Sequence, residues 1–251
     1  MYAAAATWED IAAATDSIAI VPVGSCEQHG RHLPLSTDTI IAQHIAAGVE
    51  KLIDAVVFPE IHYGYRSNPF SGGGPLFPGT IDLSAMALIS LATDILTEIL
   101  ADGFSKVLII NSHFENQFPL QEAMICAQQQ AGRDVKIMQT NWWDPLPEHI
   151  LNQLFDQGTF PGWALEHGAL TETSLMLHIA PDAVRQQNYP QEVSFSPPTY
   201  LRVPSQKTDI PSHGALASAA GASAAKGKII AQAAIAGIVD MCALEFPLRK
   251  R

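Results

Sequence analysis

Short apolar runs rich in β-branched residues alternate with segments of helical spacing along the first part of the chain. The runs, expected to form strands, are residues 17–23, 55–59, 106–110 and 135–139, and the segments expected to form helices are residues 37–54, 83–101 and 117–130. Continuous apolar runs of this length are typical of strands buried on both faces of a parallel sheet. The alternation therefore predicts a three-layer α/β fold, a mostly parallel sheet with helices on both faces. In such folds the functional sites lie beyond the carboxyl ends of the strands.

The rest of the chain is expected to join the same domain. Residues 168–180 have helical character and end before Pro181, and the Ala- and Gly-rich residues 218–243 predict a last helix. Residues 189–213 contain scattered prolines, which favour an extended surface segment suited to clamp a neighbouring subunit. Because α/β folds of 251 residues are often undivided, a single domain over residues 1–251 is expected.

Charge and cysteine content exclude several classes of function. With 14 basic and 25 acidic residues and a net charge of -11, the sequence predicts a small-molecule substrate and no nucleic-acid partner. Three widely spaced cysteines without a CxxC pair indicate neither a disulfide framework nor a zinc knuckle, and they suit a reducing cytoplasm. The N-terminus lacks the basic segment of a secretory signal, and no apolar run reaches membrane-spanning length, so no membrane partner is expected.

Two pairs of potential metal ligands directly follow predicted strands. Glu27 and His29 follow the first strand, and His113 and Glu115 follow the third. In an extended segment, residues two apart point to the same side, so each pair presents a carboxylate and an imidazole together. Asp38 follows at the start of the next predicted helix. Because strand ends meet at one edge of a parallel sheet, these five side chains are expected to converge.

A single Glu-x-His pair is weak evidence, since Glu60 and His62 form a third one and such side chains are often simply solvated. The positions of the other pairs strengthen the case, because buried carboxylates require a compensating cation. Three carboxylates and two neutral imidazoles leave three negative charges, which two divalent ions and a bridging hydroxide would balance. Mixed imidazole and carboxylate ligands suit Zn²⁺ or Mn²⁺. The residues alone thus favour a two-metal centre.

These segments resemble the creatininase (creatinine amidohydrolase) family. The motif EQHG, with an aspartate nine residues after its histidine, is specific to that family. Residues 62–80 are similar to its glycine-rich substrate loop, residues 110–117 to its second ligand pair, and residues 161–177 to a segment with a catalytic Glu-His pair. The resemblance extends over most of the chain and is strongest to the creatinine-hydrolysing members.

The resemblance implies a metal-dependent cyclic amide hydrolase that converts creatinine and water to creatine. It implies a dinuclear centre with Zn and/or Mn, a bridging hydroxide and a hexameric assembly. One ion would be held by Glu27, Asp38 and His113, and the other by His29, Asp38 and Glu115. Residues that move protons would be His167, Glu166 and Glu115, with Glu166 orienting the imidazole, and the substrate would contact Ser71, Gly72, Gly73, Gly74, Phe114, Trp143 and Trp163.

Two positions depart from the family pattern. Phe114 stands where creatininases have Tyr, and Ala164 where they have Asp. The alternatives are therefore a family hydrolase acting on another small amide, formamide or lactone, and a non-catalytic oligomer that only binds a ligand.

Trp142 is expected to point away from the site, because adjacent residues of an extended segment diverge. Glu172 is expected to be a helix-surface or structural residue.

Overall fold

A parallel four-stranded sheet forms the centre of the computed structural model, which describes residues 1–156 and 158–246. The strand order is β2-β1-β3-β4. The strands are β1 (Ile18–Val23), β2 (Ala55–Val57), β3 (Lys106–Asn111) and β4 (Lys136–Asn141). All neighbouring strands pair in parallel, so the four predicted strands are confirmed. Residues 247–251 of the predicted domain lie outside the described residues.

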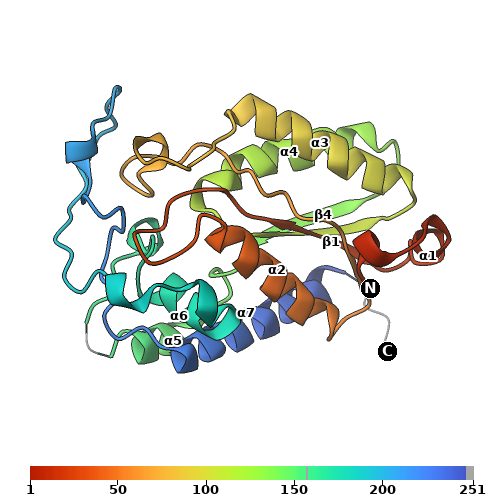
Figure 1. Cartoon of the computed structure of the whole chain (residues 1–251). Coiled ribbons are helices and arrows are strands. Elements are labelled where there is room, and N and C mark those ends of the chain that lie inside the picture. The colour runs from red at the N-terminus through yellow and green to blue at the C-terminus, as the bar shows by residue number, and fades with distance from the viewer. Residues whose placement is uncertain (157, 247–251) are drawn as a thin grey trace.

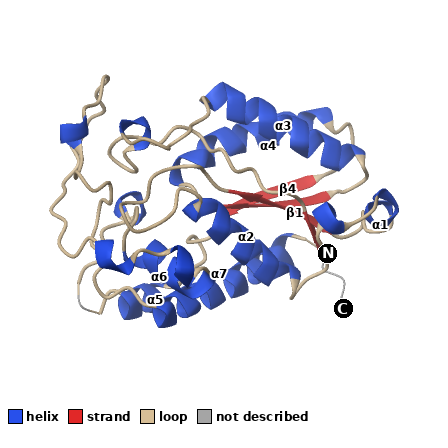
Figure 2. Ribbon diagram, in the orientation of Figure 1, coloured by secondary structure: helices blue, strands red, loops and turns tan. Residues whose placement is uncertain are grey.

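Helices cover both faces of this sheet (Figures 1 and 2). One layer contains α3 (Ala85–Ala101) and α4 (Gln117–Gln130), and the other contains α2 (Thr37–Glu50), α5 (Glu148–Leu154), α6 (Leu170–Ile179) and α7 (Ala224–Glu245). Successive strand residues point to opposite faces, so Ala19 and Val21 join the core under α3 and α4, whereas Ile18 and Ile20 join the core on the α2 side. The predicted three-layer fold is confirmed. A short α1 (Trp8–Ala12), capped by Thr7, lies near the N-terminus.

The start of α3 shows how sheet-like pairing delays a helix. Leu83 forms a parallel bridge with Tyr65 and exchanges backbone hydrogen bonds with this segment, so the chain stays extended through residue 83. Ser84 then caps the helix by accepting a hydrogen bond from the backbone N–H of Ala87. The helix therefore begins at Ala85, two residues after the predicted start.

The last helix begins at Ala224, six residues later than predicted, because Gly221 lies in a turn with a φ of 78° and Ser223 provides the N-cap. By length and composition α7 is long and apolar enough to cross a membrane. This differs from the sequence prediction that no apolar run reaches membrane-spanning length. In this structure it packs as a core helix against α6, and its Ile230, Ala234 and Ile238 are fully buried.

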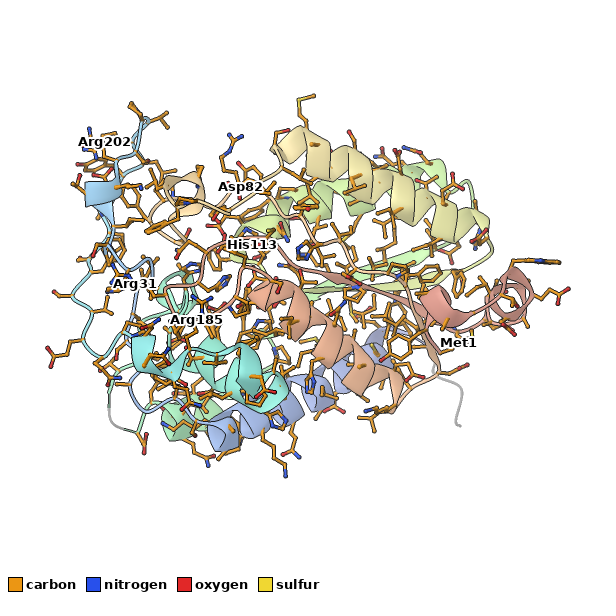
Figure 3. The ribbon with its side chains drawn as sticks, viewed as in Figure 1. Met1, Arg31, Asp82, His113, Arg185 and Arg202 are labelled. Atoms are coloured by element: carbon orange, nitrogen blue, oxygen red, sulfur yellow. The ribbon has the colours of Figure 1, made fainter. Side chains whose placement is uncertain are left out.

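Residues 189–213 run as loops with one short 3-10 turn at Lys207–Asp209, and the segment projects from the molecule at the end opposite both termini (Figure 1). Arg202 lies near the tip of this projecting segment (Figure 3), where it forms an ion pair with Asp209. In Figure 1 the tip points away from both helical layers. Its role as a clamp on a neighbouring subunit stays a prediction.

Candidate metal centre

The candidate centre lies where β1 and β3, which are paired neighbours in the sheet, reach their carboxyl ends. The loop after β1 carries Glu27 and His29, and the first turn of α2 carries Asp38. His113 follows β3. All four side chains are buried, with at most 3% of each residue exposed. The sequence prediction that these four groups converge therefore agrees with the structure.

Asp38 lies between the two imidazoles. Its Oδ1 is 2.9 Å from Nε2 of His29, and its Oδ2 is 3.3 Å from Nδ1 of His113. Glu27 lies beside both rings, with Oε2 at 3.6 Å from Nδ1 of His113 and Oε1 at 4.0 Å from Nε2 of His29. Each carboxylate oxygen of Asp38 thus faces a different imidazole, as a bridging ligand requires.

Among the described residues, three groups of side chains could hold an ion, and within each group the ligand atoms lie within 4.8 Å of one another. They are Glu27, Asp38 and His113; His29, Asp38 and Glu172; and Glu27, His29 and His167. The first group is the ligand set that the resemblance implied for one ion. The second contains Asp38 and His29 as implied, but it has Glu172 in the place that was given to Glu115.

Glu115 lies on the far side of His113 from Asp38. Its Oε2 is 3.5 Å from Nε2 of His113, the nitrogen that also lies 2.8 Å from the carbonyl oxygen of Tyr65. Its Oε1 accepts hydrogen bonds from the backbone N–H of Asn68 and from the hydroxyl of Ser71. Phe114–Asn116 form a 3-10 turn, so the two-residue rule for extended segments does not apply, although His113 and Glu115 line the same pocket.

Glu172 is the ligand candidate that the sequence did not reveal. It lies in the first turn of α6 and is only 7% exposed. Its Oε1 is 3.7 Å from Nε2 of His29, and its Oε2 accepts a hydrogen bond of 2.6 Å from the backbone N–H of Gly168. A glutamate at this position resembles an ordinary N-terminal helix residue. No spacing to the other ligands distinguishes it, since it comes from a distant part of the sequence.

The electrostatics of the centre call for a cation. Burial lowers the pKa of His113, but Glu27, Asp38 and Glu115 together raise it to about 10. Asp38 and Glu172 likewise raise the pKa of His29 well above its usual value, against the effect of burial. Burial raises the pKa of Glu27. The side chains of the centre line one pocket. Within the described part of the chain, neither Lys nor Arg lines this pocket.

Oδ1 of Asp38 is buried and, among the described residues, receives no hydrogen bond of suitable geometry. Uncompensated carboxylates are costly to bury, whereas carboxylates and imidazoles are ligands for Zn²⁺ and Mn²⁺. The residues present therefore fit a metal centre.

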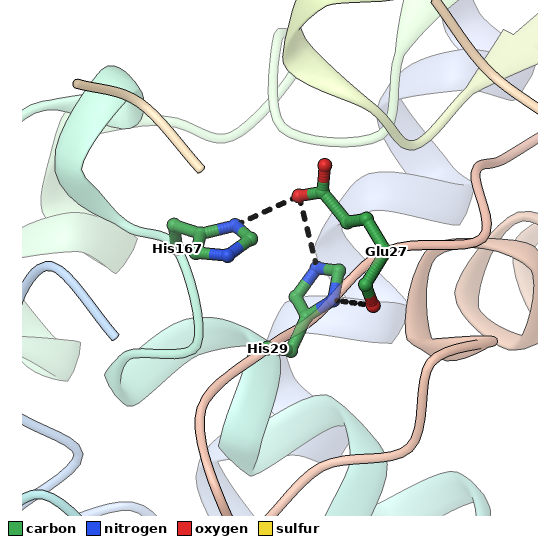
Figure 4. A group of neighbouring side chains, drawn as sticks. All are labelled: Glu27, His29 and His167. Atoms are coloured by element: carbon green, nitrogen blue, oxygen red, sulfur yellow. Dashed lines mark hydrogen bonds and ion pairs between the residues drawn. The ribbon is translucent and has the colours of Figure 1, made fainter. Parts of the chain in front are cut away.

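His167 faces this centre (Figure 4). Its Nδ1 is 3.1 Å from Oε1 of Glu27, and its ring centroid is 4.4 Å from that of His29. Burial, reinforced by His29, lowers its pKa well below the usual value, so the ring is neutral near pH 7.

Glu166 does not take the orienting role that was predicted for it. It accepts hydrogen bonds from the backbone N–H and the hydroxyl of Thr171, whereas Glu27 and Gln28 contact the nitrogens of the His167 ring. Burial raises the pKa of Glu166 to about 7, and its Oε1 is buried without a hydrogen-bond partner among the described residues. Its carboxyl lines the same pocket.

Aromatic rings form one wall of the pocket. Trp143 is stacked between Phe114 and Trp163, with ring centroids 6.3 Å and 5.9 Å away. Trp142 lines the pocket too, contrary to prediction, because the chain turns after Asn141 and adjacent side chains no longer diverge as in a strand. The free volume that these walls enclose is only about 30 Å³.

The glycine-rich loop closes over the carboxylates. Ser71 lines the pocket, and a side chain at Gly72 would come within 3.0 Å of Oε1 of Glu27, so it would press on this carboxylate. Gly73 and Gly74 have positive φ values of 75° and 44°, which favour glycine. These glycines allow the backbone to approach the centre closely.

Fold and site together define an α/β protein with a metal-capable centre at the ends of parallel strands. The family model for creatininase, creatinine amidohydrolase, matches residues 4–242. Creatinine amidohydrolase from Pseudomonas putida is 34% identical over 249 residues, which cover 96% of this chain and 95% of that protein. The chain belongs to the creatininase family and is a hydrolase of that family.

Other relatives and solved structures agree with this assignment. A mycofactocin precursor peptide peptidase from Mycobacterium tuberculosis (strain ATCC 25618 / H37Rv) is 30% identical over 237 residues, covering 89% of this chain and 82% of that protein. The structure titled "Creatininase Mn" matches with a TM-score of 0.93 at 34% identity. A mutant creatininase complexed with creatine matches with a TM-score of 0.95 at 33% identity, and each structure covers 98% of both chains.

Proposed function

We propose that this chain hydrolyses creatinine to creatine at a dinuclear metal centre bridged by Asp38. The observation that carries the proposal is the position of Asp38, with one carboxylate oxygen facing each of two buried imidazoles. Its 34% identity to a creatinine amidohydrolase over nearly the whole chain supports the choice of substrate. We propose Glu27, Asp38 and His113 as ligands of one ion, and His29, Asp38 and Glu172 as ligands of the other.

The proposed cofactors are Zn and/or Mn, because the similar creatininase structures include a Zn-Zn type mutant and a Mn creatininase. When bound, such ions would polarise the ring carbonyl and lower the pKa of water to supply the attacking hydroxide. In the balanced reaction, water oxygen adds to the carbonyl carbon, the ring C–N bond breaks and the departing nitrogen takes up a proton.

Three residues of this chain are suited to handle that proton. His167 is neutral and presents Nδ1 to the centre, where it can donate to the departing nitrogen. Glu115 lines the pocket beside Phe114, and Ser71 and Asn68 hold its carboxylate in place. Glu166 has a pKa of about 7 and an unpaired oxygen, which suits exchange of a proton near neutral pH.

The aromatic wall suits a flat ring substrate, which can stack on Trp143 or Trp163. A free volume of about 30 Å³ is close to that of one water molecule, so a substrate must displace part of the wall. Gly162, with a φ of 92° and no atom near its missing side chain, is a suitable hinge for Trp163. We therefore propose that the 161–165 segment opens to admit substrate and closes to exclude water.

The test is the conversion of creatinine to creatine by protein loaded with Mn²⁺ or Zn²⁺, followed by chromatography. Activity that needs the metal and is lost in Asp38→Asn supports the proposal. No conversion at full metal occupancy would reject creatinine as the substrate while leaving the family and the fold unchanged.

A second candidate is hydrolysis of another amide, since a mycofactocin precursor peptide peptidase is among the relatives. Phe114 favours testing it, because this pocket residue has no hydroxyl and is 40% exposed at the entrance. A panel of cyclic amides, formamides, lactones and short peptides separates the candidates. A protein that binds metal and ligand but hydrolyses none of the panel would be the non-catalytic binder.

A further inference from the structure

Gln28 lies between two proposed ligands, Glu27 and His29, and its side chain is buried in a network of polar contacts. Its Oε1 accepts a hydrogen bond of 2.9 Å from the backbone N–H of Gly30. Its Nε2 lies 2.7 Å from the carbonyl oxygen of Gly72 and 2.9 Å from that of Gly214. The same Nε2 lies 2.9 Å from Nε2 of His167. The residue is only 5% exposed.

Backbone groups fix the orientation of this amide. An amide nitrogen only donates and an amide oxygen only accepts, and here the oxygen faces an N–H while the nitrogen faces two carbonyl oxygens. Rotating the amide by half a turn would place oxygen against two carbonyl oxygens and nitrogen against an N–H. The packing is tight as well, because a side chain at Gly214 would come within 2.0 Å of Oε1 of Gln28.

This orientation decides which nitrogen of His167 carries the proton. The Gln28 nitrogen has two hydrogens and three polar neighbours, which are two carbonyl oxygens and Nε2 of His167. If one hydrogen points at Nε2 of His167, that nitrogen must be unprotonated to accept it. If both point at the carbonyl oxygens, a proton on Nε2 would face a nitrogen that cannot accept it. In either case a proton on Nε2 is disfavoured, and Nδ1, 3.1 Å from a carboxylate oxygen of Glu27, is the favoured position.

We infer that Gln28 is a positioning residue that holds His167 in the neutral tautomer with its proton on Nδ1, directed at the metal centre. Gln28 does so by joining three segments: the EQHG loop, the glycine-rich loop at Gly72 and the turn at Gly214. The tautomer itself follows from geometry alone. Its use in proton donation rests on the proposed function.

Nuclear magnetic resonance of ¹⁵N-labelled histidine in the Zn²⁺-loaded protein tests the inference directly, because protonated and unprotonated ring nitrogens have distinct chemical shifts. The His167 signals are identified by their loss in His167→Gln. In the wild-type protein we expect a protonated Nδ1 and an unprotonated Nε2. The reverse result would overturn the inference, and it would favour the third group of side chains, in which His167 is itself a candidate ligand.

Two substitutions test whether Gln28 sets this state. Gln28→Met keeps the shape of the side chain but removes the amide, and we expect protonation of Nε2 to become detectable. Gln28→Glu replaces the donor with an acceptor, and we expect Nε2 to become the main protonated position. Either variant suffices if the other does not fold. Unchanged His167 signals in a folded variant would overturn the inference.

The matched control is Asn141→Leu, which removes a buried amide that contacts Asn111 and Asp144 instead of His167. We expect the His167 signals of this variant to match the wild type, and an equal change would mean that loosening of the fold, rather than Gln28, is responsible. In the creatinine assay, Gln28→Met should lower kcat by about 10- to 100-fold with little change in KM or metal content. If the tautomer shifts as expected but wild-type protein does not act on creatinine, only the proposed function fails.

Discussion

At the scale of single residues, Asp38 is the carboxylate whose two oxygens each face one imidazole of the centre. Burial raises its pKa, but His29 and His113 hold it well below its ordinary range. Asp38→Asn keeps the shape and removes the charge, so we expect loss of both ions. Activity should fall at least about 100-fold, because even a residue that only supports a metal ligand typically costs about 10- to 100-fold when it is lost. Elemental analysis after gel filtration measures the first effect. Asp102→Asn, at the exposed end of α3, is the control, and retention of both ions in Asp38→Asn would contradict its bridging role.

Glu172 is the residue at which the structure and the sequence prediction assign the second ion differently. Glu172→Gln should bind one ion per chain instead of two, because the remaining ligands of the second ion are only His29 and the shared Asp38. Metal titration with elemental analysis measures the stoichiometry, and the exposed Glu122→Gln on α4 serves as control. Full occupancy in Glu172→Gln would return the ligand role to Glu115.

The same contacts predict that metal binding releases protons. In the metal-free protein the pKa of His113 is raised to about 10 and that of His29 is raised as well, so both rings hold protons at pH 7 and must lose them to bind metal. Affinity should therefore rise with pH. Calorimetry in two buffers of different ionisation enthalpy measures the protons released, and zero release at pH 7 would show that the rings are neutral.

The direction of these pKa shifts determines how the stability of the metal-free protein changes with pH. A raised pKa stabilises the folded metal-free protein below the pKa of the unfolded chain, and this contribution disappears as pH rises toward about 10. Thermal unfolding without metal should therefore move to lower temperature between pH 7 and pH 10. The loaded protein should change less over this range.

Four of the proposed ligands were predictable because each follows a strand or begins a helix that a short sequence pattern reveals. Glu172 was not, since its approach to His29 depends on how α6 packs against α2 and α7, which no local pattern encodes. The two-residue rule for extended chain did not describe His113 and Glu115, because Glu115 lies in a 3-10 turn. The role of Glu115 as a ligand of the second ion, which the resemblance implied, stays a prediction. Local rules therefore locate the strand-end residues but fail where a turn or a distant helix places the side chain.

At the scale of elements, the contact between α6 and α7 depends on a glycine. A side chain at Gly227 would come within 1.9 Å of the backbone carbonyl oxygen of Ser174. Gly227→Ala should destabilise the protein, because overpacking costs about 1–3 kcal/mol, which at its upper end exceeds the roughly 1 kcal/mol that alanine gains in a helix. Denaturant unfolding measures the change. Lys228→Ala, exposed on the same helix, should be nearly neutral, and equal stability of the two variants would contradict the close packing.

The strands and long helices were predictable because a strand buried on both sheet faces consists of a continuous apolar run, such as Val107 to Ile110. The short α1 and α5 were not, since a helix of two turns or fewer contains too few positions for a periodic pattern. The late start of α7 depends on a turn at Gly221, and alanine-rich sequence before that turn looks helical on its own. Tertiary packing, rather than propensity, decides these boundaries.

At the scale of the whole molecule, the two helical layers meet the sheet through separate cores, and loops from both layers reach the centre at one end. The Gly72 loop belongs to the segment before α3, whereas Glu172 comes from α6 on the other face. A bound ion would therefore join α2 and α6 to the ends of β1 and β3, beneath the Gly72 loop. The segment 189–213 projects at the same end, and its tip exposes Tyr200, Leu201 and Val203, which are 63%, 74% and 94% exposed.

Exposed apolar side chains at the tip of a projecting segment are typical of a contact surface. We therefore propose that this tip contacts a neighbouring subunit in the proposed hexamer. The double substitution Leu201→Asp and Val203→Asp should weaken assembly, because it would bury carboxylates in any contact that the tip makes. Sedimentation of the metal-loaded protein measures the assembly. The control is Leu244→Asp, 85% exposed near the opposite end of the molecule. If both variants assemble like the wild type, the tip lies outside the subunit contacts, and if the wild type is monomeric, the hexamer itself is rejected.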